Sequence, residues 1–176
     1  MLGPARYTRE ELDLYETPAW CTRTLLDHLA FQRVWEPACG LGAISKVLEA
    51  EGIDVASTDV VDRGYGSELD FLVDGHETSR DIITNPPYSL ADDFVRQALK
   101  LTERHQAGVA MLMRHEWDAG VTRDDLLVPG SRYWGKLVLT DRPRWFADSS
   151  GRPRHAYAWY IWSGKPVLFP RLLRGR

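Results

Sequence analysis

The stretch Val34-Trp35-Glu36-Pro37-Ala38-Cys39-Gly40-Leu41-Gly42 runs from a short apolar segment into a turn that contains two glycines. Glycine leaves room for a ligand against the backbone where a strand turns into a helix, and the N-terminus of the helix adds N–H donors. Beyond the turn, Ile44, Val47 and Leu48 have the spacing of one buried helix face. The stretch predicts a strand, a ligand-binding turn and a helix, as in α/β proteins.

A second turn of this kind lies at Asn85-Pro86-Pro87-Tyr88, directly after the apolar pair Ile82-Ile83. Each proline ring fixes φ at about −65° and removes a backbone N–H, so carbonyl groups are left free to point into a cleft. Such a stiff ledge suits the binding of an amino group. The alternative is an ordinary strand-to-helix turn, because Asn and Pro are common turn residues. Two such turns in one chain favour a single shared site.

Strands and helices alternate along most of the chain, which predicts a mostly parallel sheet. The expected strands are residues 34–36, 54–58, 69–72, 81–84 and 109–113. Thr17-Pro18 has the pattern of a helix start, and Ser89 and Asp92 are placed to cap a later helix. Two apolar runs, residues 136–140 and 155–162, have no convincing helix between them and predict an antiparallel hairpin at one side of the sheet.

The net charge of −3 conceals an uneven distribution. Residues 1–130 contain 12 Lys and Arg and 23 Asp and Glu. Residues 131–176 contain 10 Lys and Arg and only 2 Asp and Glu, so the last quarter of the chain is basic. Aromatic residues lie among these basic ones, and such a combination binds phosphates and unpaired bases. The residues expected in two exposed basic loops are Arg142, Arg144, Trp145, Phe146, Arg152 and Arg154. The composition favours a nucleic-acid partner, DNA or RNA, although residues 155–163 also fit a strand buried on both faces.

Other features narrow the class of protein. The sequence has no run of about 18 apolar residues and no secretory signal, and Cys21 and Cys39 fit a reducing compartment, so we expect a cytoplasmic protein without a membrane partner. His115, Glu116 and His155 make a poor ligand set, and no metal is expected. Without an internal repeat or linker, the chain is expected to form one domain over residues 1–176.

The positions of Asp59 and Ser45 relative to Gly40 indicate which class of ligand the first turn binds. Asp59 lies 19 residues after Gly40, at the end of the next expected strand, where a carboxylate can accept both hydroxyl hydrogens of a ribose. Position 45, where a dinucleotide site has a third glycine, is Ser. These residues predict a nucleoside ligand without a pyrophosphate.

Taken in order, the motifs resemble the class I S-adenosylmethionine-dependent amino-methyltransferases, specifically the adenine-N6 DNA enzymes with the gamma motif order. They are Tyr15-Glu16-Thr17-Pro18, Glu36-Pro37-Ala38-Cys39-Gly40-Leu41-Gly42, Asp59, Asp70-Phe71 and Asn85-Pro86-Pro87-Tyr88. The resemblance covers roughly residues 15–115 and implies a Rossmann-like sheet flanked by helices. It departs from the family in leaving no stretch for a separate target-recognition domain, so residues 114–154 are the expected substrate-reading segment. Small solitary enzymes of this kind resemble those of phages and prophages.

The resemblance implies S-adenosyl-L-methionine as cofactor and gives a role to each matching residue. Tyr15, Thr17 and Pro18 would hold its methionine end, and Glu36, Pro37, Ala38, Gly40 and Gly42 would wrap it. Asp59 and Val60 would lie at its ribose, and Asp70 and Phe71 would contact its adenine, Phe71 through its face or its backbone. Asn85 would also belong to the cofactor-binding residues.

The second turn, Asn85, Pro86, Pro87 and Tyr88, would be the catalytic motif. The Asn85 side-chain oxygen and the Pro86 carbonyl would accept the two N–H bonds of an exocyclic amine. Tyr88 would stack on a base flipped out of a duplex, with Trp145 or Phe146 on its opposite face. Three alternatives stay open: an RNA base as substrate, a protein glutamine as substrate, or a nucleic-acid-binding module without activity. A homodimer or a specificity partner is also left open.

Overall fold

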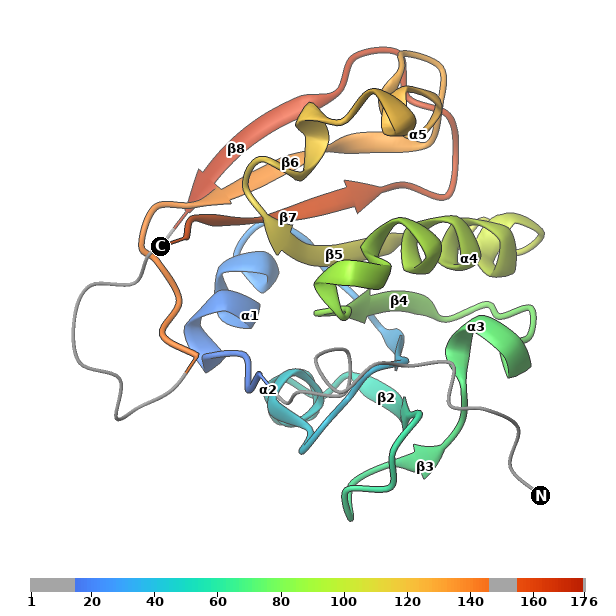
Figure 1. Ribbon diagram of the computed structural model, residues 1–176, viewed down its shortest axis with the longest axis vertical. Helices are drawn as coiled ribbons and strands as arrows, with labels where there is room; N and C mark the ends of the chain where they lie inside the picture. Colours follow the sequence, from blue (N-terminus) through green and yellow to red (C-terminus); the bar gives the residue numbers. More distant parts are fainter. Residues whose placement is uncertain (1–14, 146–154, 176) are drawn as a thin grey trace.

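The computed structural model describes residues 15–145 and 155–175, which form one sheet with helices on both faces (Figure 1). The order of the strands across the sheet is β3-β2-β1-β4-β5-β7-β6-β8. Their bounds are β1 Arg33–Glu36, β2 Asp54–Asp59, β3 Ser67–Glu68, β4 Asp81–Thr84, β5 Val109–Arg114, β6 Tyr133–Leu139, β7 Tyr157–Trp162 and β8 Arg171–Gly175. Of these described strands, only β7 runs antiparallel to its neighbours, β5 and β6.

The helices divide between the two faces of the sheet. Their bounds are α1 Ala19–Leu26, α2 Ala43–Ala50, α3 Phe71–Asp74, α4 Ala91–Glu103 and α5 Asp124–Leu127, with single 3₁₀ turns η2 Tyr88–Leu90, η3 Trp117–Ala119 and η4 Val121–Arg123. Side chains of α1 and α2 pack on one face, and those of α3, α4 and α5 pack on the other. No helix in the described part of the chain has the length and apolar character that crossing a bilayer requires.

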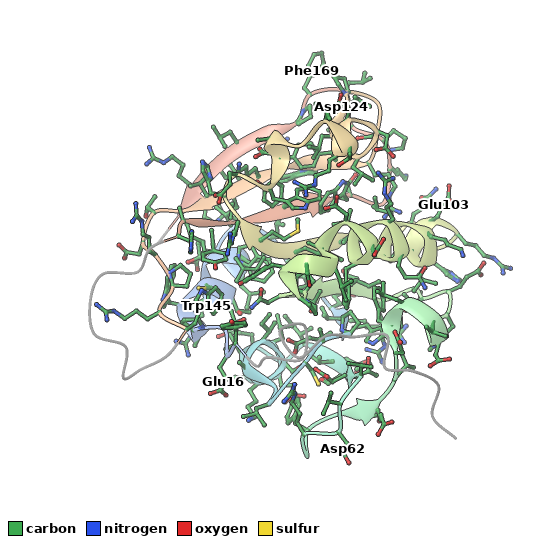
Figure 2. All side chains as sticks on the ribbon, viewed as in Figure 1. Glu16, Asp62, Glu103, Asp124, Trp145 and Phe169 are labelled. Atoms are coloured by element: carbon green, nitrogen blue, oxygen red, sulfur yellow. The ribbon has the colours of Figure 1, made fainter. Side chains whose placement is uncertain are left out.

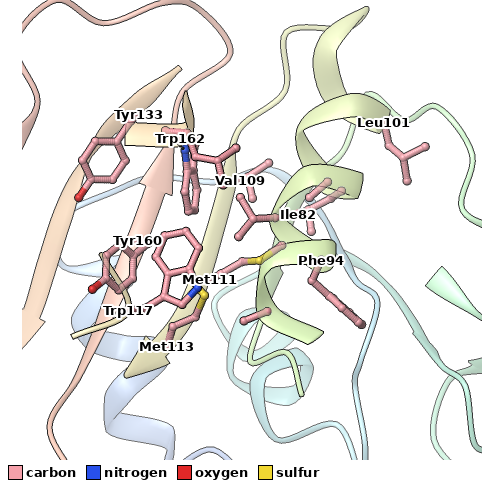
Figure 3. Close-up of a cluster of buried hydrophobic side chains, with 14 of the residues drawn as sticks. Ile82, Phe94, Leu101, Val109, Met111, Met113, Trp117, Tyr133, Tyr160 and Trp162 are labelled. Atoms are coloured by element: carbon pink, nitrogen blue, oxygen red, sulfur yellow. Dashed lines mark hydrogen bonds between the residues drawn. The ribbon is translucent and has the colours of Figure 1, made fainter. Parts of the chain in front are cut away.

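Strands β5 and β7 form the centre of the core, and their residues alternate between its two halves. Met111 and Met113 point to the α4 side with Tyr160 and Trp162, as Figure 3 shows. Leu112 points to the α1 side. All six residues of β7 are buried, which confirms that this segment is a strand covered on both faces.

The alternating pattern is confirmed as a mostly parallel sheet, and β6 and β7 form the expected antiparallel hairpin at one side. β7 lies between β5 and β6, so the hairpin extends the parallel strands directly. Strand β8 was not expected, because its sequence Arg171-Leu172-Leu173-Arg174-Gly175 is short and lacks β-branched residues. It pairs with β6 at the edge of the sheet.

The strand expected at residues 69–72 is wrong. The Asp70 carboxylate accepts the backbone N–H of Leu72 at 2.9 Å and caps the short helix α3, which begins at Phe71. The preceding strand β3 is only two residues long. A local side-chain bond to the backbone therefore overrides the apolar pattern of this segment.

The expected helix caps also differ. Pro18 stands at the N-cap of α1, and the Thr17 side chain makes no capping bond. Helix α4 has Leu90 at its N-cap and no side-chain cap. Asp92 accepts instead from the Trp117 indole at 2.7 Å and from the guanidinium of Arg123 at 2.8 Å, so it ties α4 to the segment after β5.

Two basic residues of the C-terminal quarter have structural roles. Lys136 is buried and pairs with Asp118 at 2.8 Å. Arg132 donates to the carbonyls of Ser163 at 2.7 Å and Leu99 at 2.9 Å, to the carbonyl of Ala107 and to the Thr102 hydroxyl. The basic residues left exposed in the described part of this quarter are Arg142, Arg144, Lys165, Arg171 and Arg174.

We expect Arg132→Lys to lower the free energy of unfolding by about 2–4 kcal/mol, because one ammonium group cannot reach acceptors that the planar guanidinium meets from several directions. The matched control is Arg104→Lys, at an exposed ion pair with Glu77, which should cost well under about 1 kcal/mol. Urea unfolding of both variants measures the difference. Equal stabilities would contradict a structural role for Arg132.

Candidate active site

The turn between β1 and α2 is held by a carboxylate of the next strand. Asp59, the last residue of β2, accepts the backbone N–H of Gly40 at 2.8 Å on one oxygen and that of Val61 at 3.0 Å on the other. Each carboxylate oxygen has a second lone pair, so Asp59 can still accept from a ligand hydroxyl. The structure thus brings Gly40, Asp59 and Val60 together at the carboxyl ends of β1 and β2.

Gly42 is required for two reasons. Its φ is +80°, a left-handed conformation that favours glycine, and a Cβ placed there would lie 2.3 Å from Cε1 of Tyr65. The Tyr65 ring therefore packs directly against the backbone of this turn. Its hydroxyl donates to Glu49 on α2 at 3.1 Å, which fixes the ring in this position.

Glu36 lies beneath the turn and is almost completely buried. Its carboxylate accepts the backbone N–H of Ser45 at 2.8 Å and also the Ser45 hydroxyl, which lies 2.6 Å from the hydroxyl of Ser57. Burial is the main reason that the pKa of Glu36 is raised to about 8. In this structure Glu36 braces the turn from within, and Ser45, which replaces the third glycine of a dinucleotide site, supplies the partner.

Asn85 follows β4 and is fixed by a residue far away in the sequence. Its Nδ2 donates to the Thr17 hydroxyl at 3.2 Å, which joins the end of β4 to the segment before α1. Its Oδ1 is buried and has no hydrogen-bond partner among the described residues. A buried carbonyl oxygen without a partner is costly, so a ligand N–H that reached this atom would form a stabilising hydrogen bond.

Tyr88 lies in a group of aromatic rings. The Tyr15 ring stacks on it with centroids 6.4 Å apart, and the rings of Trp145 and Tyr157 lie 6.3 and 5.6 Å away. The Trp145 indole donates to the Tyr157 hydroxyl at 3.1 Å. Burial, with a smaller effect of Tyr157, raises the pKa of Tyr88, so its hydroxyl stays neutral.

Trp145 is thus close to Tyr88, as expected, but the planes of the two rings are inclined at 61°. A base held between two aromatic faces needs them nearly parallel, so this arrangement has no slot for a base between Tyr88 and Trp145. Figure 2 shows Trp145 and Glu16 on the same side of the molecule. The other expected residues of the basic loops, Phe146, Arg152 and Arg154, lie outside the described residues.

Asp70 and Phe71 follow β3. One oxygen of Asp70 is used by the cap of α3. The Phe71 ring is in the core, edge-on to Trp35 at 5.3 Å and 5.0 Å from Phe94. Its face is therefore covered, and of the two contacts expected from Phe71 only the one through its backbone agrees with this position.

Sequence reasoning missed the bond from Asn85 to Thr17 and the bond from Glu36 to Ser45. Arg114, the last residue of β5, and Glu116 lie within residues 114–154, the expected substrate-reading segment, but neither was expected as an individual binding residue, although both lie at the edge of the sheet where ligands of α/β proteins bind. That position in the topology was the signal available for them. In residues 15–145 and 155–175, no three His, Cys, Asp or Glu side chains are grouped as metal ligands.

Neither a family model nor a curated protein matches the sequence. Solved structures match its fold at low identity. They include a protein from Pyrococcus horikoshii proposed to be an RNA methyltransferase (TM-score 0.62, 14% identity, 92% of this chain and 91% of that one) and a predicted O-methyltransferase from Agrobacterium tumefaciens (TM-score 0.58, 17% identity, 89% and 84%). A third is the modification subunit of a proposed type I restriction enzyme from Vibrio vulnificus (TM-score 0.57, 14% identity), of which the match covers 45% against 88% of this chain. The chain has the Rossmann-like fold of class I methyltransferases.

We expect Gly42→Ala to destabilise the protein more than Gly64→Ala. Both positions have a left-handed φ, +80° and +78°, but a Cβ at Gly64 meets no atom within 4 Å. Gly64→Ala should therefore cost only the backbone strain of about 1–2 kcal/mol, and Gly42→Ala should add the clash with Tyr65. Urea unfolding measures the excess, and Tyr65→Ala should remove it. An excess that persists without the ring would refute the packing argument.

Glu36 gives a prediction for pH dependence. Because its folded pKa of about 8 lies above the ordinary value of 4.5, the folded state holds the proton more tightly than the unfolded chain. Its contribution to stability is complete below about pH 4.5 and is lost as the pH rises to about 8, by up to about 1.4 kcal/mol per pH unit. Glu36→Gln does not titrate, so its melting temperature should gain on that of the native protein between pH 5 and 9. A constant difference would show that Glu36 is ionised throughout.

Proposed function

We propose that the protein transfers the methyl group of S-adenosyl-L-methionine to an exocyclic amino group, and that the preferred acceptor is adenine N6 in DNA. The observation that carries this proposal is the buried Asn85 Oδ1 without a partner, at the carboxyl end of β4. A carbonyl oxygen in this position can accept an N–H bond of an amine, and the neighbouring Pro86 carbonyl can accept the other. The motif Asn85-Pro86-Pro87-Tyr88 thus suits an amine rather than a hydroxyl acceptor.

The residues present fit the cofactor. Gly40 leaves the backbone of the turn after β1 without a side chain of its own beside Asp59, whereas the space at Gly42 is taken by the Tyr65 ring. Asp59 retains lone pairs for the two ribose hydroxyls. Thr17 lies at the Asn85 side of the site, where the methionine end would face the acceptor. When bound, S-adenosyl-L-methionine supplies an electrophilic methyl group on its sulfonium sulfur.

The chain contributes mainly by positioning. The lone pair of an exocyclic amine is delocalised into the base, so Asn85 and Pro86 must orient the amine until the lone pair points at the methyl carbon. The N–C bond forms as the S–C bond breaks, and one amine proton then leaves to water. The two oxygen acceptors stabilise the positive charge that develops on nitrogen during the transfer.

The preference for a nucleic-acid substrate over a protein substrate rests on exposed positive charge. Arg142, Arg144, Lys165, Arg171 and Arg174 are exposed, and Arg171 lies 5.2 Å from the ring of Trp134. Such a surface suits a phosphate backbone better than a protein glutamine. Two of the similar structures are described as a proposed RNA methyltransferase and the modification subunit of a proposed restriction enzyme, which is in keeping with a nucleic acid but favours neither DNA nor RNA.

We further propose that the chain acts as one methyltransferase domain in the cytoplasm, and that it belongs to the small solitary DNA enzymes of the gamma motif order found in phages and prophages. The free cysteines Cys21 and Cys39 support a reducing compartment. Because Phe146 lies outside the described residues and Trp145 is inclined to Tyr88, we assign stacking on the target base to Tyr88 alone.

The function is tested by transfer of a labelled methyl group from S-adenosyl-L-methionine to duplex DNA, single-stranded DNA, RNA and a protein extract, followed by analysis of the modified nucleoside or residue. N6-methyladenine in DNA is the expected product. Label in RNA or in protein glutamine would keep the chemistry and change the substrate. Cofactor binding without transfer to any of the four would favour a binding module over an enzyme.

We expect Asn85→Ala to lower the rate of transfer by about 10²–10³, the usual effect of removing one preorganised polar group from a reacting centre. Cofactor affinity, measured by calorimetry, should change less than about threefold. The control is Gln32→Ala, which removes an exposed amide just before β1, at the opposite edge of the sheet. A transfer rate of Asn85→Ala close to that of Gln32→Ala would exclude the proposed role of Asn85.

A further inference from the structure

A cavity of about 420 Å³ lies next to the candidate active site, between the start of α4 and the segment after β5. Tyr88 and Ser89 form one wall, and Arg114, Glu116, Trp117 and Arg123 form much of the other. Asn85 and Pro86 are not part of its lining. Tyr88 thus borders both this cavity and the position proposed for the acceptor amine, at Asn85 and Pro86. The cavity itself is separate from that position, and its size suits a small ligand group.

Of the charged side chains that line this cavity, Arg123 is ion-paired, whereas Arg114 and Glu116 are not paired within the described residues. Arg123 is fixed by both oxygens of Asp92, at 2.8 and 3.0 Å, and its guanidinium lies 4.8 Å from the centre of the Trp117 ring. Arg114 and Glu116 are exposed, and neither forms an ion pair with another residue that the structure describes. One cation and one carboxylate in the cavity are thus available to a ligand.

Arg114 stands at the boundary between the cavity and the amine position. Its guanidinium carbon is 6.0 Å from the centre of the Tyr88 ring, the ring to which we assign stacking on the target base. In a nucleic-acid strand, a phosphate lies between each base and the next. A strand that places one base at Tyr88 and the next in the cavity brings this phosphate near Arg114.

We propose that the cavity binds the nucleotide adjacent to the methyl acceptor in an unpaired strand, with Arg114 on the phosphate between the two nucleotides and Glu116 on an amino group of the neighbouring base. This inference rests on the proposed function, because it takes Asn85 as the position of the acceptor amine. Trp117 and the fixed Arg123 form the flat wall against which the base lies. Residues 114–123 then read sequence within the methyltransferase fold itself.

Glu116 makes the proposal specific. An ionised carboxylate accepts hydrogen bonds and cannot donate them, so it favours a base with an amino group at its edge. Cytosine has this group at position 4, where uracil has an oxygen that would face the carboxylate with another acceptor. The two bases are the same in size and shape and differ only along this edge, at position 4 and at position 3, where cytosine accepts and uracil donates a hydrogen bond, so they form a matched pair for the test.

The experiment measures the binding of fluorescently labelled single-stranded DNA heptamers by anisotropy with the full chain. Each heptamer is thymidine except for one central deoxyadenosine and one neighbour, deoxycytidine or deoxyuridine, on its 5′ or its 3′ side. We expect deoxycytidine to bind about tenfold more tightly on one of the two sides. Glu116→Ala should reduce this preference to less than about twofold. Arg114→Ala should lower the slope of log affinity against log salt by about 0.7, the value for one phosphate of a single strand.

Glu103→Ala and Arg104→Ala are the matched controls, because they remove the same charges at the C-terminal end of α4, where Figure 2 shows Glu103. The 13 residues of this helix span about 20 Å, and the cavity lies at its other end. Both should leave the preference and the salt slope unchanged. Equal affinity for both bases on both sides, a preference that survives Glu116→Ala, or no binding to any heptamer would overturn the proposal. Because the readout is binding, a preference found without methyl transfer would retain the cavity assignment and reject the proposed activity.

Discussion

The candidate site depends on the two hydrogen bonds that the Asp59 carboxylate accepts from backbone N–H groups. This carboxylate accepts one backbone N–H from the turn after β1 and one from the segment after β2, so a single side chain holds two loops at the edge of the sheet. Hydrogen bonds to a charged group contribute about 1.5–3 kcal/mol each, more than neutral ones. Since Asp59 is also the residue expected to meet the ribose, the shape of the turn and the binding of a nucleoside depend on the same two oxygens.

At the end of β4, the Asn85 side chain likewise combines a structural hydrogen bond with an acceptor proposed to meet a ligand. The bond from Asn85 to Thr17 joins positions 68 residues apart and fixes the amide before any ligand arrives. Its partner atom Oδ1 stays buried and unpaired within the described structure, which is a cost that the fold bears at this position. Below the neighbouring turn, Glu36 and Ser45 form a polar contact in the core that no ligand needs to touch. The contacts that support the site therefore lie inside the protein.

Much of this arrangement could be predicted from local patterns. The apolar runs predicted β1, β4, β5 and β7. Asp59 at the end of one strand, and Gly40 and Asn85 just after two others, were expected at one edge of the sheet for that reason. The pattern failed where a side chain bonds its own backbone, as at Asp70. It also failed for Arg132 and Lys136, because composition alone does not show that a basic group is buried among acceptors that come from distant strands and helices.

The aromatic group around Tyr88 has a consequence for affinity. Tyr15 and Trp145 are the first and last residues of the described stretch 15–145, and both contact the ring on which a base is expected to stack. A base that approaches Tyr88 must replace contacts worth about 0.5–1.5 kcal/mol with stacking worth about 1–3 kcal/mol. Under the proposed function, these rings would compete with the substrate base, and the affinity for the base would be the small difference between two similar energies. Under the same proposal, a weakly stacking side chain, such as the amide of a glutamine, would not displace these rings.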